Sequence, residues 1–327
     1  MEGFTHDGEF VLVAEDGAND LKNYPVKCVN GRIWVNNHAH VLQGKAGISD
    51  NSFLAFAISQ SDIESLLVGG SRAKLNAETL MSIEFKLPCL QEQYRIGEYL
   101  TQLDHLITLH QRKFEKLTNV KKSMLEKMFP QNGSSYPEIR FKGFTDPWEQ
   151  RKLGDCFTER VESMPDGELI SVTINDGIKK FSELGRHDNS NDDKSKYKKV
   201  CVGDIAYNSM RMWQGASGYS PYEGIVSPAY TVLSPNSGIN SKCLSYQFKL
   251  PEMIHTFQVN SQGITSDNWN LKYPALSHIE VFVSKDEQEQ AKIAEYFENL
   301  DNLITLHQRE LEKLQNIKKS MLEKMFV

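Results

Sequence analysis

The chain has 327 residues, 39% hydrophobic and 24% charged, as expected of a soluble globular protein with about two domains. Its formal net charge of -6 does not itself indicate nucleic-acid binding, although a local basic surface can coexist with acidic helices. It has no apolar run of membrane-spanning length and no secretory signal at residues 1–7, so we expect no membrane span and a cytoplasmic location.

The cysteines give no sign of a metal or redox centre. No two of them lie within four residues of each other, so there is no C-x-x-C pair. An odd, scattered set of this kind favours reduced, mostly buried thiols in a cytoplasm. They are Cys28, Cys89, Cys156, Cys201 and Cys243.

The first predicted element, residues 1–90, is a small globular region. Asn36, Asn37 and His38 have the composition of a hairpin turn. His38 and His40 have a spacing compatible with metal binding, but no further ligands cluster near them in the sequence, so we favour a structural role. Arg72 and Lys74 form a second polar segment before the next element.

The second predicted element, residues 91–130, is a long helix. Apolar residues recur at steps of three and four, and Gly97 is the only glycine before Pro130 ends the pattern. At 1.5 Å per residue, the helix would be roughly 55–60 Å long. A stripe of this length needs a partner, because one helix cannot bury it alone.

The third predicted element, residues 131–285, is a second globular region of mixed helix and strand character. Clusters of Gly, Pro, Asn and Ser separate its short strand-like runs. These runs are residues 169–174, 199–202, 204–207, 225–226, 230–233 and 278–283, and a helix is predicted at residues 243–257.

The fourth predicted element, residues 286–327, repeats the first helix. Residues 288–326 align with residues 91–129 without a gap, and 28 of the 39 positions are identical, which rules out chance. We expect the two copies to pack antiparallel, with His110 and His307 meeting at the centre and setting the register rather than acting as a pH switch. The predicted seam comprises Leu103, Leu106, His110, Leu117, Leu300, Leu303, His307 and Leu314.

The two globular regions also resemble each other weakly. Residues 35–42 can be aligned with residues 226–233, and residues 80–85 with residues 276–281. Nothing in the first region matches residues 136–199, so we expect the first region to lack the N-terminal part that the second has. The predicted fold is α+β, with two mixed α/β regions separated by two long repeated helices that form an antiparallel coiled coil.

This order of elements resembles the DNA specificity subunit of type I restriction–modification systems. Three strings are similar to that family: YPEIRFKGFTDPWEQRKLGD at 136–155, YNSMRMWQG at 207–215 and GIVSPAYTVL at 224–233. The near-identical helices complete the likeness, which covers the chain apart from the part missing from its first region. The resemblance implies a non-catalytic subunit whose two regions are target-recognition domains.

The resemblance further implies a place in a larger bacterial assembly. Each recognition domain would read one half of a bipartite site on double-stranded DNA, and the helix pair would set the gap between the halves. Two methyltransferase subunits would dock on the helices, and restriction and translocase subunits would join them. S-adenosylmethionine, ATP and magnesium would be bound by those partners, with no cofactor in this chain.

Under this interpretation, lysines of a basic stretch would contact phosphates, whereas amide and arginine side chains near aromatic residues would read bases. The basic stretch could instead be a solvated loop, and Tyr207 and Trp213 could instead be core residues. The candidates are Lys179, Lys180, Arg186, Lys196, Lys198, Lys199, Tyr207, Asn208, Arg211, Trp213, Gln214, Asn268, Trp269, Asn270 and Lys272, with Asn36, Asn37, His38, Arg72 and Lys74 in the first region.

Enzyme motifs are not found. Residues 145–148 (TDPW) fall short of a methyltransferase motif, and no Gly-rich cofactor loop precedes them. Residues 165–168 (PDGE) lack the following lysine of a nuclease, and no Walker A, G-x-S-x-G or H-E-x-x-H sequence occurs. The alternatives to a specificity subunit are a coiled-coil scaffold that binds proteins, a degenerate subunit, and an enzyme with unrecognised motifs.

Overall fold

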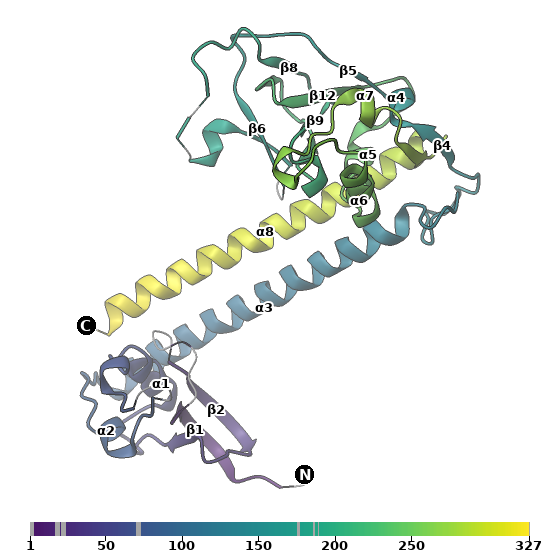
Figure 1. Ribbon diagram of the computed structural model, residues 1–327. Helices are drawn as coiled ribbons and strands as arrows, with labels where there is room; N and C mark the ends of the chain where they lie inside the picture. Colours follow the sequence, from purple (N-terminus) through teal and green to yellow (C-terminus); the bar gives the residue numbers. More distant parts are fainter. Residues whose placement is uncertain are drawn as a thin grey trace. The chain divides into compact units, whose positions relative to one another are not determined.

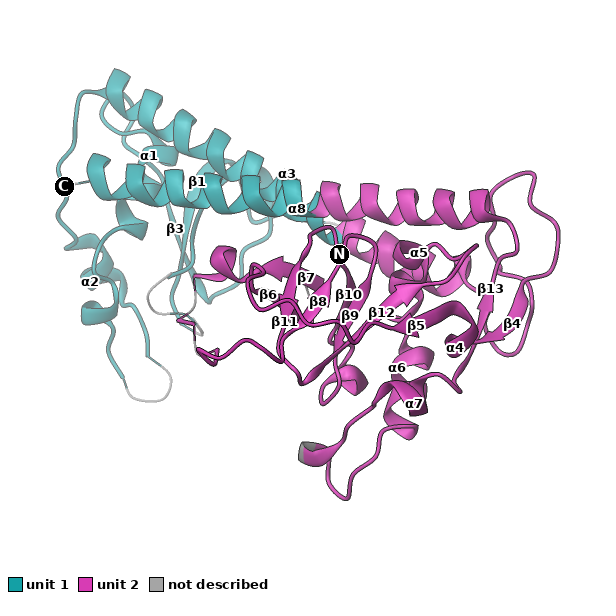
Figure 2. Cartoon of the chain, turned by 90° about the horizontal axis from the view of Figure 1, so that it is seen from above, with its two compact units in different colours: residues 1–115, 305–327 teal, residues 116–304 magenta. Residues whose placement is uncertain are grey.

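The computed structural model describes residues 3–16, 20, 24–69, 73–174, 177–185, 187–188 and 190–326. The chain divides into two compact units, unit 1 with residues 1–115 and 305–327 and unit 2 with residues 116–304 (Figure 2). Two long helices, α3 (Leu90–Met128) and α8 (Glu287–Met325), contribute one part to each unit. Every helix in the described part of the chain is too short or too polar to cross a membrane.

Unit 1 contains a small antiparallel sheet with strand order β2-β1-β3, of which Figure 1 labels β1 and β2. Alternate residues of β1 point into a core, so that Val11 and Val13 are fully buried. The Asp50 carboxylate caps α1 by accepting a hydrogen bond from the Phe53 backbone N–H. The elements of unit 1 are β1 (His6–Ala14), β2 (Val26–Ile33), β3 (Ala39–Leu42), α1 (Asn51–Ser59), η1 (Glu64–Leu66) and α2 (Ala77–Met81).

The described residues of unit 2 form a four-stranded sheet of order β10-β9-β12-β5 and three strand pairs, β11-β8, β13-β4 and β6-β7. Its first elements are β4 (Glu149–Lys152), α4 (Leu153–Cys156), β5 (Phe157–Glu159), β6 (Ile170–Thr173), β7 (Gly177–Lys180), η2 (Phe181–Leu184), β8 (Lys198–Val200), β9 (Ile205–Asn208) and η3 (Met212–Gln214). They are followed by β10 (Ser217–Tyr219), β11 (Gly224–Val226), β12 (Tyr230–Pro235), α5 (Ser241–Gln247), α6 (Pro251–Val259), η4 (Ser266–Asn268), α7 (Tyr273–Leu276) and β13 (Glu280–Val283).

Each predicted strand-like run of the second region overlaps an observed strand. The segment at residues 243–257 is mostly helical, as predicted, but it is divided into two helices, α5 and α6. Pro251 explains the break, since it has no N–H to continue a helix but fits well in the first turn of a new one. The α+β class is confirmed.

The two units are copies of each other in more than their helices. The sheet β2-β1-β3 of unit 1 has the same pairing as β10-β9-β12 of unit 2. At the start of α3, the amide oxygen of buried Gln93 accepts a hydrogen bond from the Asp50 N–H at 3.0 Å. At the start of α8, buried Gln290 accepts one from the Asn240 N–H at 2.8 Å. The same polar contact therefore joins each long helix to the N-cap residue of a short helix, α1 in unit 1 and α5 in unit 2.

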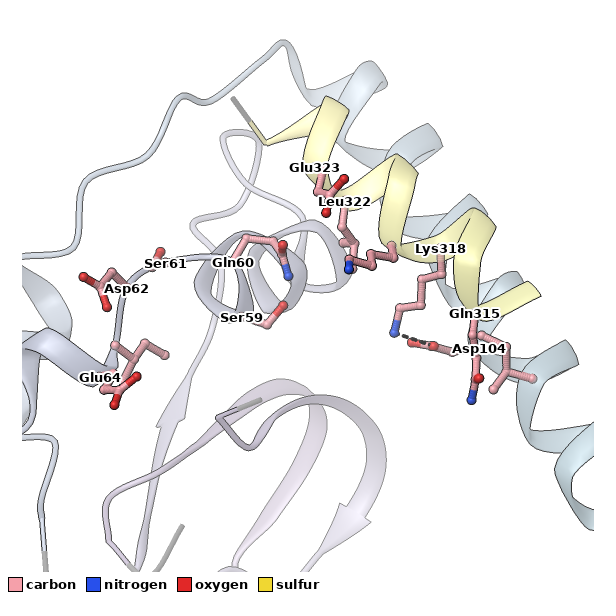
Figure 3. A pocket seen from close by; sticks show the side chains of 13 residues that line it. Ser59, Gln60, Ser61, Asp62, Glu64, Asp104, Gln315, Lys318, Leu322 and Glu323 are labelled. Atoms are coloured by element: carbon pink, nitrogen blue, oxygen red, sulfur yellow. Dashed lines mark ion pairs between the residues drawn. The ribbon is translucent and has the colours of Figure 1, made fainter. Parts of the chain in front are cut away.

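The two long helices pack antiparallel, as predicted. In unit 1, Lys318 of α8 pairs with Asp104 of α3 (Figure 3). In unit 2, the same two repeat positions pair with the helices exchanged, Lys121 of α3 with Asp301 of α8. Ion pairs at the same repeat positions can form in both units only when the two helices run in opposite directions.

The seam follows alternating steps of four and three residues, as in a heptad coiled coil. The prediction that Leu106 and Leu303 lie in this seam was wrong, because their side chains are 42% and 44% exposed. A step of four residues from Leu103 and Leu300 places Ile107 and Ile304 in the seam instead. The seam positions are Leu103, Ile107, His110, Phe114 and Leu117 in α3, and Leu300, Ile304, His307, Leu311 and Leu314 in α8.

The predicted meeting of His110 and His307 is confirmed. Their Nδ1 atoms are 3.1 Å apart, and the two rings pack edge to face with centroids 5.1 Å apart. Burial lowers the pKa of His307, and the nearby His110 and Lys113 act in the same direction. The folded chain therefore favours the neutral form of this imidazole.

We expect the helix pair to lose stability as the pH falls below about 6.5. Because the folded pKa of His307 is lowered, the unfolded chain takes up protons first, and the contribution present above that pH is lost as the pH drops. Thermal unfolding at about pH 7.5 and about pH 5.5 measures this loss. The double variant His110→Leu/His307→Leu is expected to be more stable and less dependent on pH; an unchanged pH dependence would contradict the assignment.

Candidate nucleic-acid interface

Two polar, aromatic loops that are far apart in the sequence lie together in unit 2. Trp213 in the first loop and Trp269 in the second contact each other edge to face, with ring centroids 5.3 Å apart. The Leu271 N–H donates a 2.8 Å hydrogen bond to the Ser209 carbonyl, which joins the two backbones. We call this region the tryptophan surface: Asn208, Arg211, Trp213, Gln214, Asn268, Trp269, Asn270 and Lys272.

The first loop leaves the end of β9 and is held by its own backbone and by a buried anchor. The Asn208 side chain accepts a hydrogen bond from the Met210 N–H at 3.0 Å, and the Trp213 indole donates one to the Met210 carbonyl at 3.1 Å. Met212 is fully buried, and Gly215 ends the turn with a φ of 80°. This arrangement leaves Arg211 exposed while holding Trp213 in place.

The second loop is a closed turn between α6 and α7. Gln262 and Asn270 exchange two backbone hydrogen bonds, of 3.0 and 2.8 Å, and close the loop. Gly263 has a φ of 147°, and a Cβ there would lie 2.6 Å from the Asn268 carbonyl oxygen, so only glycine fits. Ile264, which sequence reasoning missed, is fully exposed at the tip. An apolar residue beside a glycine in an otherwise polar turn was the available signal.

The tryptophan surface has the chemistry needed to bind a nucleic acid. In the described part of the chain, Arg211 forms no ion pair, and its guanidinium donates one long hydrogen bond, of 3.4 Å, to Gln214. Lys272 is also exposed. Arginine can pair with guanine, amide side chains with adenine, and aromatic rings can stack on bases.

Tyr207 is a correction to the predicted set. Its side chain is fully buried in the core of unit 2, so it cannot contact a ligand from the surface. The reason is the place of β9, which has neighbours on both edges, β10 and β12. Sequence alternation alone could not distinguish a central strand from an edge strand.

The lysines of the basic stretch are less available to bind phosphate than the sequence implied. Lys180 pairs with Glu168 at 2.9 Å, and Lys198 pairs with Glu159 at 3.3 Å. Lys199 is 3.9 Å from a carboxylate of Glu223, Lys179 is half-buried, and Lys196 is exposed. Arg186 lies outside the described residues. Carboxylates therefore compensate three of the positive charges, which makes this stretch a weaker phosphate-binding candidate than the tryptophan surface.

Lys249, which sequence reasoning missed, holds the base of the first loop. Its ammonium donates hydrogen bonds to the carbonyls of Gly215 and Ser217, at 2.6 and 2.7 Å. Burial, and secondarily the charge of Lys121, lowers the pKa of Lys249 to about 8. No sequence motif marks this residue, because its acceptors are backbone carbonyls more than thirty residues away.

The candidates of unit 1 are joined by a buried carboxylate. Asp16 accepts from the His38 imidazole at 3.0 Å and lies 3.7 Å from the Lys74 ammonium, which also pairs with Glu15 at 3.4 Å. The exposed Asn36 and Asn37 lie in the turn before β3, and Arg72 lies outside the described residues. The structure thus brings the predicted turn and Lys74 together, and the Lys74 ammonium already lies beside the carboxylates of Glu15 and Asp16.

A cavity of about 750 Å³ in unit 1 lies between the end of α1 and the helices α3 and α8 (Figure 3). Its lining is mainly polar and of mixed charge, and it includes the ion pair between Asp104 and Lys318. The lining has neither a cysteine nor a histidine. In the described part of the chain, no three His, Cys, Asp or Glu side chains gather as ligands for a metal ion.

Nearly the whole chain is similar to known proteins. The protein family described as "Type I restriction modification DNA specificity domain" matches residues 2–119 and 145–316. A putative type I restriction enzyme specificity subunit of Haemophilus influenzae is 41% identical over 106 residues, which are 32% of this chain and 27% of that protein. The type I restriction enzyme MjaVIII specificity subunit of Methanocaldococcus jannaschii is 23% identical over 302 residues, which are 86% and 70% of the two chains.

A solved structure has the same fold. The S subunit of the type I restriction–modification system from M. genitalium is similar with a TM-score of 0.68 and 16% identity. The similarity covers 100% of this chain and 85% of that one. This likeness supports the fold of the chain.

Proposed function

Because the chain belongs to the family of type I restriction–modification DNA specificity domains, we propose that it reads a bipartite site on double-stranded DNA. The observation that carries the proposal is the tryptophan surface, where Arg211, which pairs with no described carboxylate, and several amide side chains lie on the same two loops as the packed tryptophans. The duplicated unit 1 would read the second half of the site through its turn before β3. The chain is the non-catalytic component, and chemistry belongs to other subunits.

We further propose two equivalent docking places for two methyltransferase subunits. Leu106 and Leu109 of α3 and their repeats Leu303 and Leu306 of α8 are exposed, although they are large and apolar. Residues three apart lie on one face of a helix, so each helix presents a leucine pair to solvent. Exposed apolar patches of this kind favour protein partners. S-adenosylmethionine, ATP and magnesium would be bound by these partners and by the restriction and translocase subunits that join them.

The first experiment is to co-purify the chain with a methyltransferase subunit from the same source and to map methylated adenines in DNA exposed to the complex. We expect a stable complex and a motif in two parts separated by a gap. A complex that methylates nothing would indicate a degenerate subunit. A complex with no affinity for DNA at any salt concentration would favour the protein-binding scaffold.

Lengthening both helices by one heptad should lengthen the gap in the DNA site. Seven residues inserted after His110 and seven before His307 keep the alternation of the seam and add about 10.5 Å, or roughly three base pairs. Mapped methylation measures the new gap. A four-residue insertion in α3 alone is the control, because it breaks the alternation and should reduce stability. An unchanged gap in a stable heptad variant would contradict the role of the helices as a spacer.

A further inference from the structure

The ammonium group of Lys249 connects two segments of unit 2 that are distant from each other in the sequence. It donates hydrogen bonds to the Gly215 and Ser217 carbonyls, at 2.6 and 2.7 Å, and a longer one, of 3.3 Å, to the Ile174 carbonyl. The first two acceptors lie at the end of the first loop of the tryptophan surface, and the third follows β6. An ammonium group has three N–H donors, so these three carbonyls use all of them.

Backbone hydrogen bonds lead from this contact to Arg211. The N–H groups of Gln214 and Ala216 both donate to the Arg211 carbonyl, at 2.9 and 3.2 Å. The two loop residues that Lys249 holds come directly before and directly after Ala216. The backbone of Arg211 is therefore fixed to a turn whose position depends on the ammonium group.

The strand that follows the first loop also packs closely on the hairpin of β6 and β7. A Cβ atom on Gly218 of β10 would lie 3.0 Å from the Gly177 Cα and from the Ile178 nitrogen of β7, closer than ordinary contacts. Lys249 adds a polar contact to this close approach, because it joins the end of β6 to the residues just before Gly218. The hairpin, the first loop and Lys249 therefore form one packed group.

The charge of Lys249 is not balanced by a carboxylate in the described part of the chain. Its cationic neighbour Lys121 pairs with Asp301, and burial, together with Lys121, lowers the pKa of Lys249 to about 8. Removing an unpaired cation from water costs free energy that an apolar side chain of similar size would not cost. The presence of a lysine here therefore points to a role in fixing the carbonyls, beyond filling space.

We propose that Lys249 is a positioning residue for DNA recognition by unit 2, where it holds residues 211–216 in the conformation in which Arg211 contacts a base. The inference rests on the proposed reading of DNA by the tryptophan surface. Lys249 does not itself contact DNA, because its three donors are engaged by the protein. It raises the fraction of molecules whose loop is ready to bind, and the apparent affinity is proportional to that fraction.

The test measures binding of the complex with the methyltransferase subunit to DNA sites that are altered in one half at a time. We expect Lys249→Met to reduce discrimination at the half-site read by unit 2 by about tenfold, as when about one molecule in ten holds the binding conformation. Discrimination at the other half-site and affinity for unrelated DNA should not change. Lys249→Arg keeps a cation with several donors and should retain most of the discrimination.

A double variant tests whether Lys249 acts through Arg211. Arg211→Ala removes the side chain that Lys249 is proposed to position, so Lys249→Met should cause little further loss of discrimination when both changes are present. Two independent contacts with DNA would instead give additive losses. Additive losses would therefore contradict the proposed role of Lys249.

Two controls separate a loosened loop from a damaged fold. Lys242→Met is the matched variant, because this lysine of α5 pairs with Glu298 and holds no loop carbonyl, so discrimination should not change. Hydrogen exchange should become faster at the N–H groups of Gln214 and Ala216 in Lys249→Met, and remain as in the natural chain along β12. If Lys249→Met does not fold, Lys249→Gln, which is neutral but keeps two donors, takes its place.

Three results would overturn the proposal. One is faster exchange in the loop with unchanged discrimination, which would make Lys249 a structural residue only. Another is an equal loss of affinity for all DNA with a weaker dependence on salt, which would indicate a direct contact between Lys249 and a phosphate. A natural complex with no affinity for DNA would remove the proposed function as well, whereas a natural complex that reads a bipartite site no better than Lys249→Met would remove this inference alone.

Discussion

Replacing Glu289 with glutamine is expected to lower the free energy of unfolding by about 3–5 kcal/mol, the cost of breaking a buried ion pair. The carboxylate is fully buried and receives hydrogen bonds from Arg140, Trp148 and Ser284. Glutamine would leave the Arg140 guanidinium, which is only 14% exposed, without its counter-ion. Its carboxamide NH₂ would also face side chains that donate hydrogen bonds.

The control for this change lies in the same chain. Glu92 occupies the same position of the repeat but is exposed, so Glu92→Gln should change the free energy of unfolding by less than about 0.5 kcal/mol. Denaturant unfolding followed by tryptophan fluorescence measures both variants, and Trp148 reports directly on the site. Equal losses in the two variants would show that burial of Glu289 does not determine its contribution.

Replacing Arg211 with alanine is expected to weaken recognition of one half of the DNA site by about 1–3 kcal/mol, or roughly 5- to 150-fold. Arg211 is an exposed cation of the tryptophan surface, and its charge is not compensated by any described carboxylate. If it contacts a base, the loss should be confined to the half-site that unit 2 reads. Binding of the complex to sites altered in one half measures this effect.

Two further variants separate base contacts from general attraction. Lys272→Ala should weaken binding to all sequences alike and reduce the dependence on salt by about one phosphate contact. Arg151→Ala should have no effect on DNA, because Arg151 lies on β4 and pairs with Glu149. An Arg211→Ala variant that keeps full affinity and specificity would remove the tryptophan surface from the recognition site.

The tests of Glu289 and Arg211 address different levels of the structure. The first concerns what stabilises unit 2 internally, and the second concerns what unit 2 presents to a ligand. A stable Arg211→Ala variant that unfolds like the natural chain would allow its DNA phenotype to be interpreted as recognition.

The sequence by itself determined the long-range pairing of α3 and α8. Repeated identical residues at heptad spacing specify a seam whose partner is another copy of the same seam, so the contact between His110 and His307 follows from position alone. The error at Leu106 and Leu303 has a related cause. Both the leucine and the following isoleucine are apolar, and only the four-three alternation decides which one faces the partner.

Tertiary structure alone decided which side chains are available to a ligand. Tyr207 and Trp213 look alike in the sequence, yet the central strand β9 buries the first and a loop partly exposes the second. The contact between Trp213 and Trp269 joins two loops that no local pattern links. Likewise, Glu92 and Glu289 share one repeat position, and only the packing of residues 135–152 makes one a buried ion-pair partner and leaves the other exposed. Local periodicity encodes which face of an element turns inward, whereas burial depends on neighbours that come from elsewhere in the chain.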